Sequence, residues 1–293
     1  MMFKEMKYGG NKKVIKILHL YSSLMNLYGD WANAAVLTRA VKARGFEAIL
    51  ETCDTGCQSD ISSYSVIIIG SGTELSQRAC IKDIKRHEGE LRKHIEDGGI
   101  VLATGNSHEL FGNAITDRSG NRNEALGFIN FETVQLNTRV TGDCLFTAPF
   151  INDKLIGFIN RAGGEQSGDI SQRRERVVKG NNAGEQTLSE QSDAAQRPFK
   201  LEPGQGAGFG PCYEGIRYKN FLGTYVTGPI LVRNPPLLRY FTDIICAGAD
   251  AHEVNGADGT SSIEARRESD LFFKHQEEGY QKALRSMTSL SND

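Results

Sequence analysis

The sequence contains no long hydrophobic run and no clear excess of charge of either sign. No apolar stretch approaches the roughly 18–20 residues that a membrane-spanning helix needs, so we expect no membrane span. The 34 Lys and Arg residues nearly balance the 36 Asp and Glu residues, giving a formal net charge of -2. This balance gives no indication of binding to nucleic acid. Residues 1–13 are charged and have no apolar core, so we expect no secretory signal and a cytoplasmic protein.

Cysteine is sparse, and motifs for phosphate or metal are absent or weak. Six cysteines are spread over 293 residues, a usage typical of reduced thiols in the cytosol. Cys53 and Cys57 form a C-x-x-x-C pair without a second pair of ligands, so zinc is only weakly indicated. Cys80 lies on an apolar helical stripe and favours a core position. Because no G-x-x-x-x-G-K-[ST] motif occurs, we expect no cofactor and no metal, and any ATP chemistry would belong to a partner chain.

The first 112 residues alternate between strand-like and helix-like segments. The strand-like segments are 14–21, 46–52, 65–70 and 100–103, and the helix-like ones are 30–44 and 76–96. Unbroken apolar runs such as SVIIIG are typical of parallel strands buried on both faces. The alternation therefore predicts an α/β fold with a flavodoxin-like, doubly wound sheet.

Beyond residue 113 the pattern changes to additional strands and a C-terminal helix. Paired strands are predicted at 129–136 and 139–147, and further strand-like segments at 155–160 and 213–231. Residues 162–200 are polar and rich in Gly, Gln and Ser, which predicts a mobile insertion. We expect a flexible tail over 1–13, a main domain over 14–246, and a linker and helix over 247–293. That helix either packs on its own domain or binds a partner.

The chain is organised around GIVLATGNSHELFG, residues 99–112. Its strand, sharp turn and short helix form the layout on which several α/β enzymes mount a nucleophile. Gly105 occupies the tip of the turn and has no reactive side chain. Ser107 and His108 offer an alternative nucleophile and base, but adjacent residues point apart and no third group orients them.

A pocket is expected where this turn meets the loop after residues 65–70. Ligands of open α/β sheets bind at the carboxyl ends of the strands, and the start of a helix offers free N–H groups. We expect seven residues to line this pocket: Gly70, Ser71, Gly72, Asn106, Ser107, His108 and Glu109.

Two other features have mainly structural interpretations. In LMNLYGD, Gly29 suits a turn with positive φ and Asp30 suits a helix N-cap, although pocket shaping is the alternative. His87, His94, His252 and His275 fall on helix or linker positions that we expect to be exposed, and no role is assigned to them.

Three stretches together resemble a known family. They are LYSSLMNLYGDWAN (20–33), IVLATGNSHELFG (100–112) and EGIRYKNFLGTYVTGPILVRNP (214–235). In this order they are similar to class I glutamine amidotransferases of the cobyric acid synthase type. The likeness is strongest to members that act as glutaminase subunits of a separate Mur-ligase-like synthetase, which amidates the peptidoglycan stem. The glycine-rich GSGTE loop fits as well.

The resemblance implies a cysteine nucleophile at the strand–turn–helix elbow and a histidine base in the GTY-x-x-GP strand. Here the nucleophile position falls on Gly105 and the base position on Thr227. Neither residue can perform the chemistry of the group it replaces. The resemblance thus implies the family's fold and a Mur-ligase-like partner, together with a pseudoenzyme that has lost glutaminase activity.

Two rival hypotheses remain open. One is a hydrolase of altered mechanism that uses Ser107. The other is a free-standing ligand-binding or regulatory domain with a small-molecule ligand and no synthetase partner.

Overall fold

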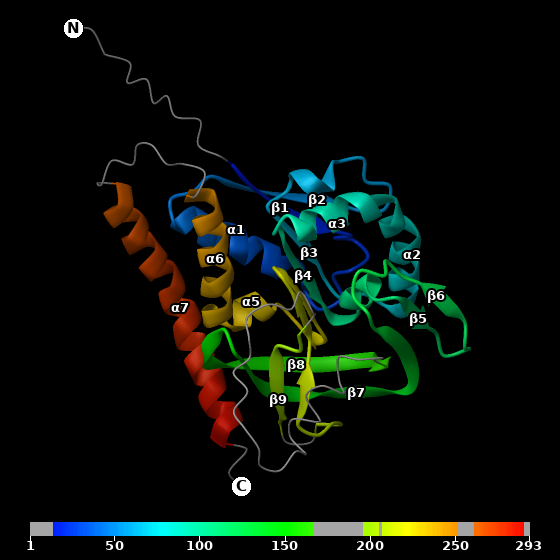
Figure 1. Cartoon of the computed structure of the whole chain (residues 1–293). Helices are drawn as coiled ribbons and strands as arrows, with labels where there is room; N and C mark the ends of the chain where they lie inside the picture. The colour runs from blue at the N-terminus through cyan, green and yellow to red at the C-terminus, as the bar shows by residue number, and fades with distance from the viewer. Residues whose placement is uncertain (1–13, 167–195, 205–206, 251–260, 290–293) are drawn as a thin grey trace, which may run out of the picture.

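The structure is a computed structural model, and it describes residues 14–166, 196–204, 207–250 and 261–289. Two sheets and the helices around them make up this part of the chain (Figure 1). The flexible tail predicted over 1–13, most of the mobile insertion predicted over 162–200, and His252 lie outside the described residues. No helix of the described part is both long and apolar enough to cross a bilayer.

The first sheet has six strands in the order β11-β12-β4-β3-β1-β2. Its strands are β1 (Ile15–Leu20), β2 (Ala48–Cys53), β3 (Val66–Ile69), β4 (Ile100–Thr104), β11 (Ile216–Tyr218) and β12 (Phe221–Thr224). All neighbours pair in parallel except β11, which is antiparallel to β12. The parallel strands follow the flavodoxin-like order 2-1-3-4-5, so the predicted fold class is confirmed.

Successive side chains of the central strands point to opposite faces and feed two separate cores. Ile68 and Leu102 pack with α1 (Trp31–Ala43), α5 (Ile230–Arg233) and α6 (Pro235–Asp250). Ile67 and Val101 pack instead with α2 (Glu74–Ile84) and α3 (Glu88–Glu96). Helices therefore cover both faces of the sheet, as Figure 1 shows. This double coverage explains why the strands read as unbroken apolar runs.

The helix predicted over 76–96 is two helices. α2 begins earlier, because the Thr73 hydroxyl accepts the Ser76 amide as an N-cap. The 3₁₀ turn η2 (Lys85–His87) separates it from α3. This turn changes which residues face inward, and the predicted exposure of His87 and His94 is wrong: they are 6% and 4% exposed. His94 Nε2 lies 3.2 Å from the Ile100 carbonyl, and burial lowers the pKa of its imidazole.

The second sheet is built around one long antiparallel pair, β7 (Glu132–Ala148) and β8 (Ile151–Gln166). The strands predicted at 129–136 and 139–147 are therefore not partners. They are one strand whose register shifts between Gln135 and Val140. The insertion predicted over 162–200 is too wide at both ends, because residues 162–166 belong to β8 and residues 199 and 200 belong to β9 (Phe199–Pro203). The remaining members are β5 (Ala114–Thr116), β6 (Arg122–Glu124), β10 (Cys212–Glu214) and β13 (Val226–Thr227).

The C-terminal helix α7 (Ser261–Ser289) packs on its own domain. Phe273 and Tyr280 are 6% and 3% exposed, and the Tyr280 hydroxyl donates to the Lys154 carbonyl of β8. An ion pair of 2.6 Å joins Arg239 of α6 to Glu277. Of the two interpretations of this helix, the contacts favour intramolecular packing for its described side chains.

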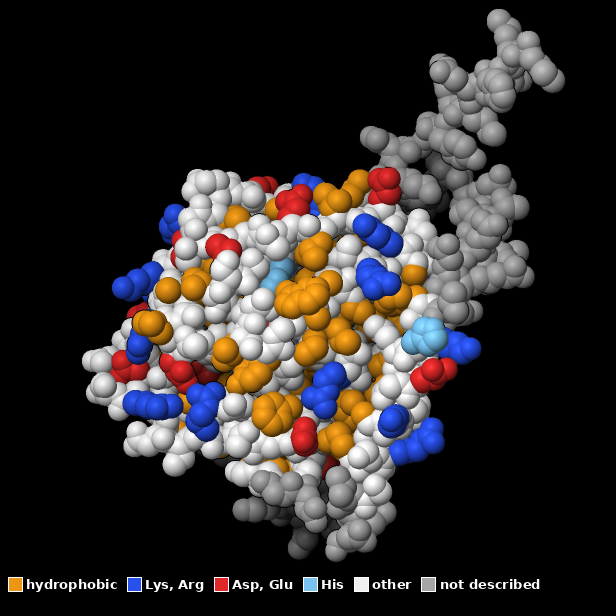
Figure 2. All heavy atoms as spheres, turned by 180° about the vertical axis from the view of Figure 1, so that it is seen from behind, with side chains coloured by type: hydrophobic (Ala, Val, Ile, Leu, Met, Phe, Trp, Pro, Cys, Tyr) orange, Lys and Arg blue, Asp and Glu red, His pale blue; other side chains and the backbone are white. Residues whose placement is uncertain are grey.

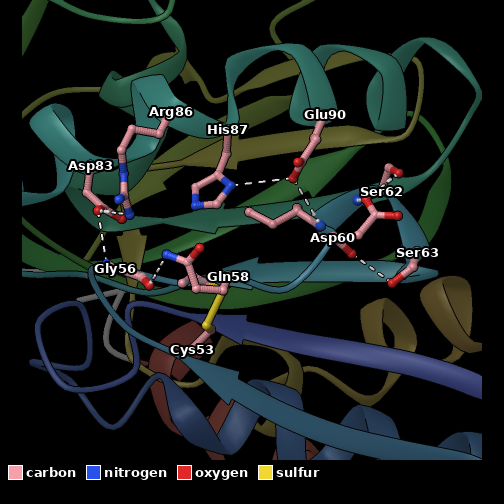
Figure 3. Close-up of polar contacts among 12 residues, drawn as sticks. Cys53, Gly56, Gln58, Asp60, Ser62, Ser63, Asp83, Arg86, His87 and Glu90 are labelled. Carbon is pink, nitrogen blue, oxygen red and sulfur yellow. Dashed lines mark hydrogen bonds and ion pairs between the residues drawn. A yellow bond between two sulfur atoms is a disulfide. The ribbon is translucent and has the colours of Figure 1, made fainter.

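Cys53 and Cys57 form a disulfide, so the prediction that all cysteines are reduced is wrong for this pair (Figure 3). The turn between β2 and the 3₁₀ turn η1 (Ile61–Ser63) brings them together, with their Cα atoms 5.7 Å apart. The weak zinc interpretation also fails, because the two sulfurs bond to each other. Cys80 is fully buried in the core, as predicted.

Charges of both signs are mixed on the molecular surface. Figure 2 shows the face hidden in Figure 1, where hydrophobic side chains gather near the middle and Lys, Arg, Asp and Glu side chains lie mostly around them. No continuous block of one charge is visible there, in agreement with the near-zero net charge of the sequence.

Candidate functional site

The site lies at the carboxyl ends of β1, β3 and β4, where three loops meet. These are the β1–α1 loop (21–30), the glycine-rich loop after β3 (70–73) and the turn η3 (Gly105–Phe111) after β4. The Leu27 amide donates to the Ser71 carbonyl at 2.8 Å, and the Gly72 amide donates to Asn106 Oδ1 at 2.9 Å. Neighbouring parallel strands thus bring together segments that lie far apart in the sequence.

A pocket opens at this junction, with about 350 Å³ of space that is partly open to solvent. Among the seven residues expected there, Ser71, Gly72, Asn106 and Glu109 line it, whereas Gly70, Ser107 and His108 are not among its lining residues. Gly105 and Thr227 both line it. The two positions to which the resemblance assigns nucleophile and base therefore face the same cavity from different elements.

Gly105 has a φ of +61°, a conformation that side chains disfavour. A Cβ atom built there would lie 2.1 Å from Ser71 Oγ and 2.7 Å from Ser71 Cβ. These separations are far below van der Waals contact, so Ser71 fills the space that a side chain at position 105 would need. Ser71 itself is 2% exposed, and the described part of the chain offers its hydroxyl no hydrogen-bond partner.

Thr227 ends the short strand β13, which pairs with β8. Its hydroxyl donates to the Phe158 carbonyl at 3.1 Å, and the residue is 2% exposed. A threonine hydroxyl engaged in this way fixes the edge of the pocket. It does not titrate near neutral pH, so it cannot act as a general base.

The side-chain carboxylate of Asp30 links the three loops to one another. Its carboxylate accepts hydrogen bonds from the Ser71 amide at 3.1 Å, the Thr104 hydroxyl at 2.8 Å and the Tyr28 amide at 3.3 Å. Asp30 is the N-cap residue of α1, as predicted, but its side chain makes no cap hydrogen bond, and the Trp31 amide donates to Asn26 Oδ1 instead. Burial raises the pKa of the Asp30 carboxyl against the opposing effect of these bonds. The pocket-shaping alternative for this motif describes Asp30 better.

Close approach to Asp30 also explains the glycine at position 70. A Cβ atom there would lie 2.3 Å from Asp30 Cβ and 2.3 Å from the Met25 carbonyl oxygen. Gly70 therefore lets the β1–α1 loop and the loop after β3 touch through their backbones. Gly29 has the predicted positive φ, at +73°.

Ser107 and His108 point away from solvent. The Ser107 hydroxyl lies 2.9 Å from the Ile69 carbonyl and 2.8 Å from the Thr104 carbonyl, and His108 Nδ1 lies 2.7 Å from the Gly105 carbonyl. Both residues are fully buried. The His108 ring also packs edge-on against Tyr225, with centroids 4.3 Å apart. These contacts hold the turn in place and leave Ser107 without the access that a nucleophile needs.

The pocket contains a buried polar cluster, of which the sequence predicted only Glu109. Glu109 is 2% exposed and accepts hydrogen bonds from Gln77 Nε2 and the Tyr225 hydroxyl, each at 2.7 Å. Gln77 also donates to the Asn106 carbonyl. Tyr225 lies within the GTYVTGP stretch, so that motif was a usable signal, whereas Gln77 looks like any polar residue on a helix.

The opposite wall carries paired charges. Arg139 of β7 contacts Glu74 at 2.9 Å and Asn160 Oδ1 at 2.6 Å. Burial raises the pKa of the Glu74 carboxyl. Hydrogen bonds from the Glu74 backbone amide and from Arg139 outweigh burial, so the pKa is lowered overall. The pairing of β7 with β8 brings Arg139 to Asn160, and Glu74 reaches Arg139 from α2, so the sequence positions of these residues gave no signal. The described residues contain no cluster of His, Cys, Asp and Glu suited to a metal ion.

Comparison with known proteins bears on this arrangement. Residues 16–235 match the model of the CobB/CobQ-like glutamine amidotransferase domain. The chain belongs to this family. The match includes all three loops of the site and Thr227, and it confirms the resemblance found in the sequence.

Two relatives share most of their length with this chain. Subunit GatD of the glutamine-hydrolysing lipid II isoglutaminyl synthase of Streptococcus pneumoniae (strain ATCC BAA-255 / R6) is 28% identical over 224 residues, covering 76% of this chain and 77% of the relative. The subunit of the same name from Staphylococcus aureus (strain N315) is 26% identical over 234 residues, covering 79% and 84%. A solved glutamine amidotransferase structure aligns with a TM-score of 0.46 and 15% identity, covering 78% of this chain and 98% of that one.

Proposed function

We propose that this chain is a glutamine amidotransferase-like subunit without glutaminase activity, working beside a Mur-ligase-like synthetase. One observation carries the loss of activity: Ser71 occupies the space that a nucleophile's side chain at position 105 would need. The family assignment supplies the fold, and the names of both relatives supply the setting of a synthase subunit in peptidoglycan amidation.

Glutamine hydrolysis requires an atom that attacks the side-chain amide carbon and a base that takes its proton. Gly105 offers no attacking atom. The Thr227 hydroxyl donates to a carbonyl and cannot accept a proton near neutral pH. Loss of the nucleophile alone reduces hydrolytic rates by about 10⁶-fold in well-studied catalytic units. Two such losses in one pocket support a scaffold that kept its fold after its reaction was removed.

A partner follows from the chemistry that the chain lacks. The sequence has no phosphate-binding G-x-x-x-x-G-K-[ST] motif, and both relatives are named as subunits. We therefore assign ATP-dependent amidation to a separate Mur-ligase-like chain in the cytoplasm. The remaining pocket suits a small-molecule ligand or contact with that chain, so the role left to this subunit is to stabilise the synthetase or close its active site.

Glutamate release by the purified chain tests the loss of activity. We expect no glutamate from glutamine above the blank without enzyme. Release well above that blank, abolished in Ser107→Ala or His108→Ala, would overturn the proposal. Affinity purification of the tagged chain from its native cell tests the partner: recovery of a Mur-ligase-like chain supports the subunit role, and recovery of the tagged chain alone favours a free-standing domain.

The alternative of a serine hydrolase receives no support from the geometry. Ser107 Oγ lies within hydrogen-bond distance of two carbonyl groups and is fully buried. A fluorophosphonate probe is expected to leave Ser107 unlabelled, as judged by mass spectrometry of the tryptic peptides. Labelling of the wild-type chain that disappears in Ser107→Ala would favour that alternative.

A further inference from the structure

We propose that Cys53 and Cys57 form a reversible disulfide site, reduced by a dithiol, that sets the order of the β1–α1 loop under the pocket. The pair lies at the carboxyl end of β2, at the same edge of the sheet as the pocket loops. Figure 3 shows the disulfide beneath α2 and α3, beside the turn that contains Gly56. This disulfide site does not depend on whether the chain hydrolyses glutamine.

The two cysteines differ in exposure. Cys57 is 6% exposed, whereas Cys53 is half-buried and the intervening Thr55 and Gly56 are exposed. A thiolate of the dithiol therefore reaches Cys53 first, forms a mixed disulfide with it and releases Cys57 as a thiolate. The second thiol of the reductant then displaces Cys53. Overall, two electrons and two protons pass to the cysteine pair, and the reductant leaves as a disulfide.

Asp54, one of the three residues between the two cysteines, holds the β1–α1 loop directly. Its carboxylate accepts hydrogen bonds from the Ser23 amide at 2.9 Å and the Ser23 hydroxyl at 2.7 Å. The Ser22 hydroxyl lies 3.4 Å from the same carboxylate. The disulfide fixes the loop that presents Asp54, so it also fixes where residues 22 and 23 sit.

Asp83 of α2 provides a second link. One of its oxygens accepts the Gly56 amide at 3.0 Å, and the other accepts the Tyr21 hydroxyl at 3.0 Å. Tyr21 is fully buried with a φ of +60°, and its amide donates to the Cys53 carbonyl. A non-glycine residue in this conformation persists only when its surroundings hold it. Cys53 and Asp83 both contribute to that restraint.

The β1–α1 loop carries the effect to the pocket. The Tyr21 carbonyl accepts the Met25 amide at 2.8 Å, and the Leu27 amide donates to the Ser71 carbonyl. Met25 also packs so closely that a Cβ atom on Gly72 would lie 2.3 Å from its sulfur. Greater backbone mobility at Tyr21 therefore also increases the mobility of Ser71 and Gly72, which line the pocket.

A third cysteine nearby does not interfere. Cys80 lies on α2 one turn before Asp83, but it is fully buried. Burial raises the pKa of its thiol to about 12, with the nearby Asp83 carboxylate adding to the effect. Because the thiolate is the reactive form in exchange, Cys80 stays inert toward the disulfide near neutral pH.

Peptide mapping without reductant and hydrogen–deuterium exchange test this site in the full-length chain. The oxidised protein should yield a Cys53–Cys57 linked peptide, and dithiothreitol should convert it to two thiols. The backbone amides of residues 21–30 and 70–72 should then exchange about tenfold faster, and the exchange rates of the α6 amides should stay the same. Cys53→Ser/Cys57→Ser should match the reduced wild type, and Cys212→Ser, in the second sheet, should match the oxidised one.

Two results would overturn the proposal. One is the recovery of both cysteines as thiols after air oxidation and rapid alkylation. The other is an unchanged exchange rate of residues 21–30 on reduction of the wild-type chain, a measurement that holds even if the double variant folds poorly. Neither readout involves glutamine, so failure here leaves the proposed function untouched.

Discussion

Gly105 and Ser71 form a complementary pair at the tip of the turn after β4. The glycine adopts φ +61°, and the serine side chain lies where a Cβ atom at position 105 would project. Restoring a cysteine at position 105 alone would force the loop that carries Ser71 to move. The proposed loss of the nucleophile is therefore tied to the packing of two loops and not only to a missing side chain.

Gly105→Ala should destabilise the protein more than the backbone conformation alone explains. Positive φ costs about 1 kcal/mol for alanine, and overlap with Ser71 adds about 1–3 kcal/mol. Gly120→Ala is the matched control, because Gly120 has a φ of +84° and no atom within 4 Å of a built Cβ. Urea unfolding of both variants checks this. Equal losses of stability would show that Ser71 does not fill the position.

Asp30→Asn should also destabilise the fold, by about 1–3 kcal/mol. The new amide group would replace Oδ2, which accepts the amides of Ser71 and Tyr28, or Oδ1, which accepts the Thr104 hydroxyl. Urea midpoints at neutral pH give the loss. Stability unchanged within experimental error would contradict the role of Asp30 as the link between the three loops.

The raised pKa of the Asp30 carboxyl predicts in which direction the free energy of unfolding changes with pH. Burial raises its native pKa above the unfolded value, 3.8. Between these two pKa values the native state binds more protons than the unfolded one, so stability falls as pH rises through this window. The stability gap between wild type and Asp30→Asn should therefore narrow as pH rises above about 4. A gap that widens over the same range would contradict the raised pKa.

Among the elements, α7 gives the clearest test of packing. Phe273 joins the core cluster that contains α1 and α6, and Arg239 lies over its ring at 5.2 Å from the centroid. Phe273→Ala should cost about 3 kcal/mol, measured by thermal or urea unfolding. His275→Ala is the control, since that side chain is 80% exposed and should change stability by no more than about 0.5 kcal/mol. A loss at Phe273 as small as that at His275 would show that the helix is not docked in solution.

Elements that depend on local pattern could be predicted from the sequence, and those that depend on partners could not. The apolar run at 65–70 contains β3, and the helix expected over 30–44 is α1, with Arg44 as its C-cap. The break at η2 was invisible, because Lys85 and Arg86 are good helix formers and only packing turns His87 inward. The length of β7 likewise follows from its pairing with β8, which no local signal encodes.

At the scale of the whole molecule, the order of the parallel strands explains why a pocket could be expected at all. Segments that end at the same sheet edge meet in space. Ser71, Asn106 and Glu109 could therefore be predicted from the sequence as residues that line the pocket. Arg139 and Asn160 line the pocket from the second sheet, and the buried Asp30 carboxylate holds the loops beside it. The sequence left pocket shaping by this motif as an alternative, but it gave no sign of which loops Asp30 would bind.

The fate of the amide nitrogen of glutamine tests the central proposal most directly. Glutamine labelled with ¹⁵N in its side-chain amide is incubated with the purified chain, and with any synthetase that co-purifies with it, and followed by NMR. The account predicts that the label stays in glutamine in both samples. Appearance of the label as free ammonium, or in an amidated acceptor, would contradict it.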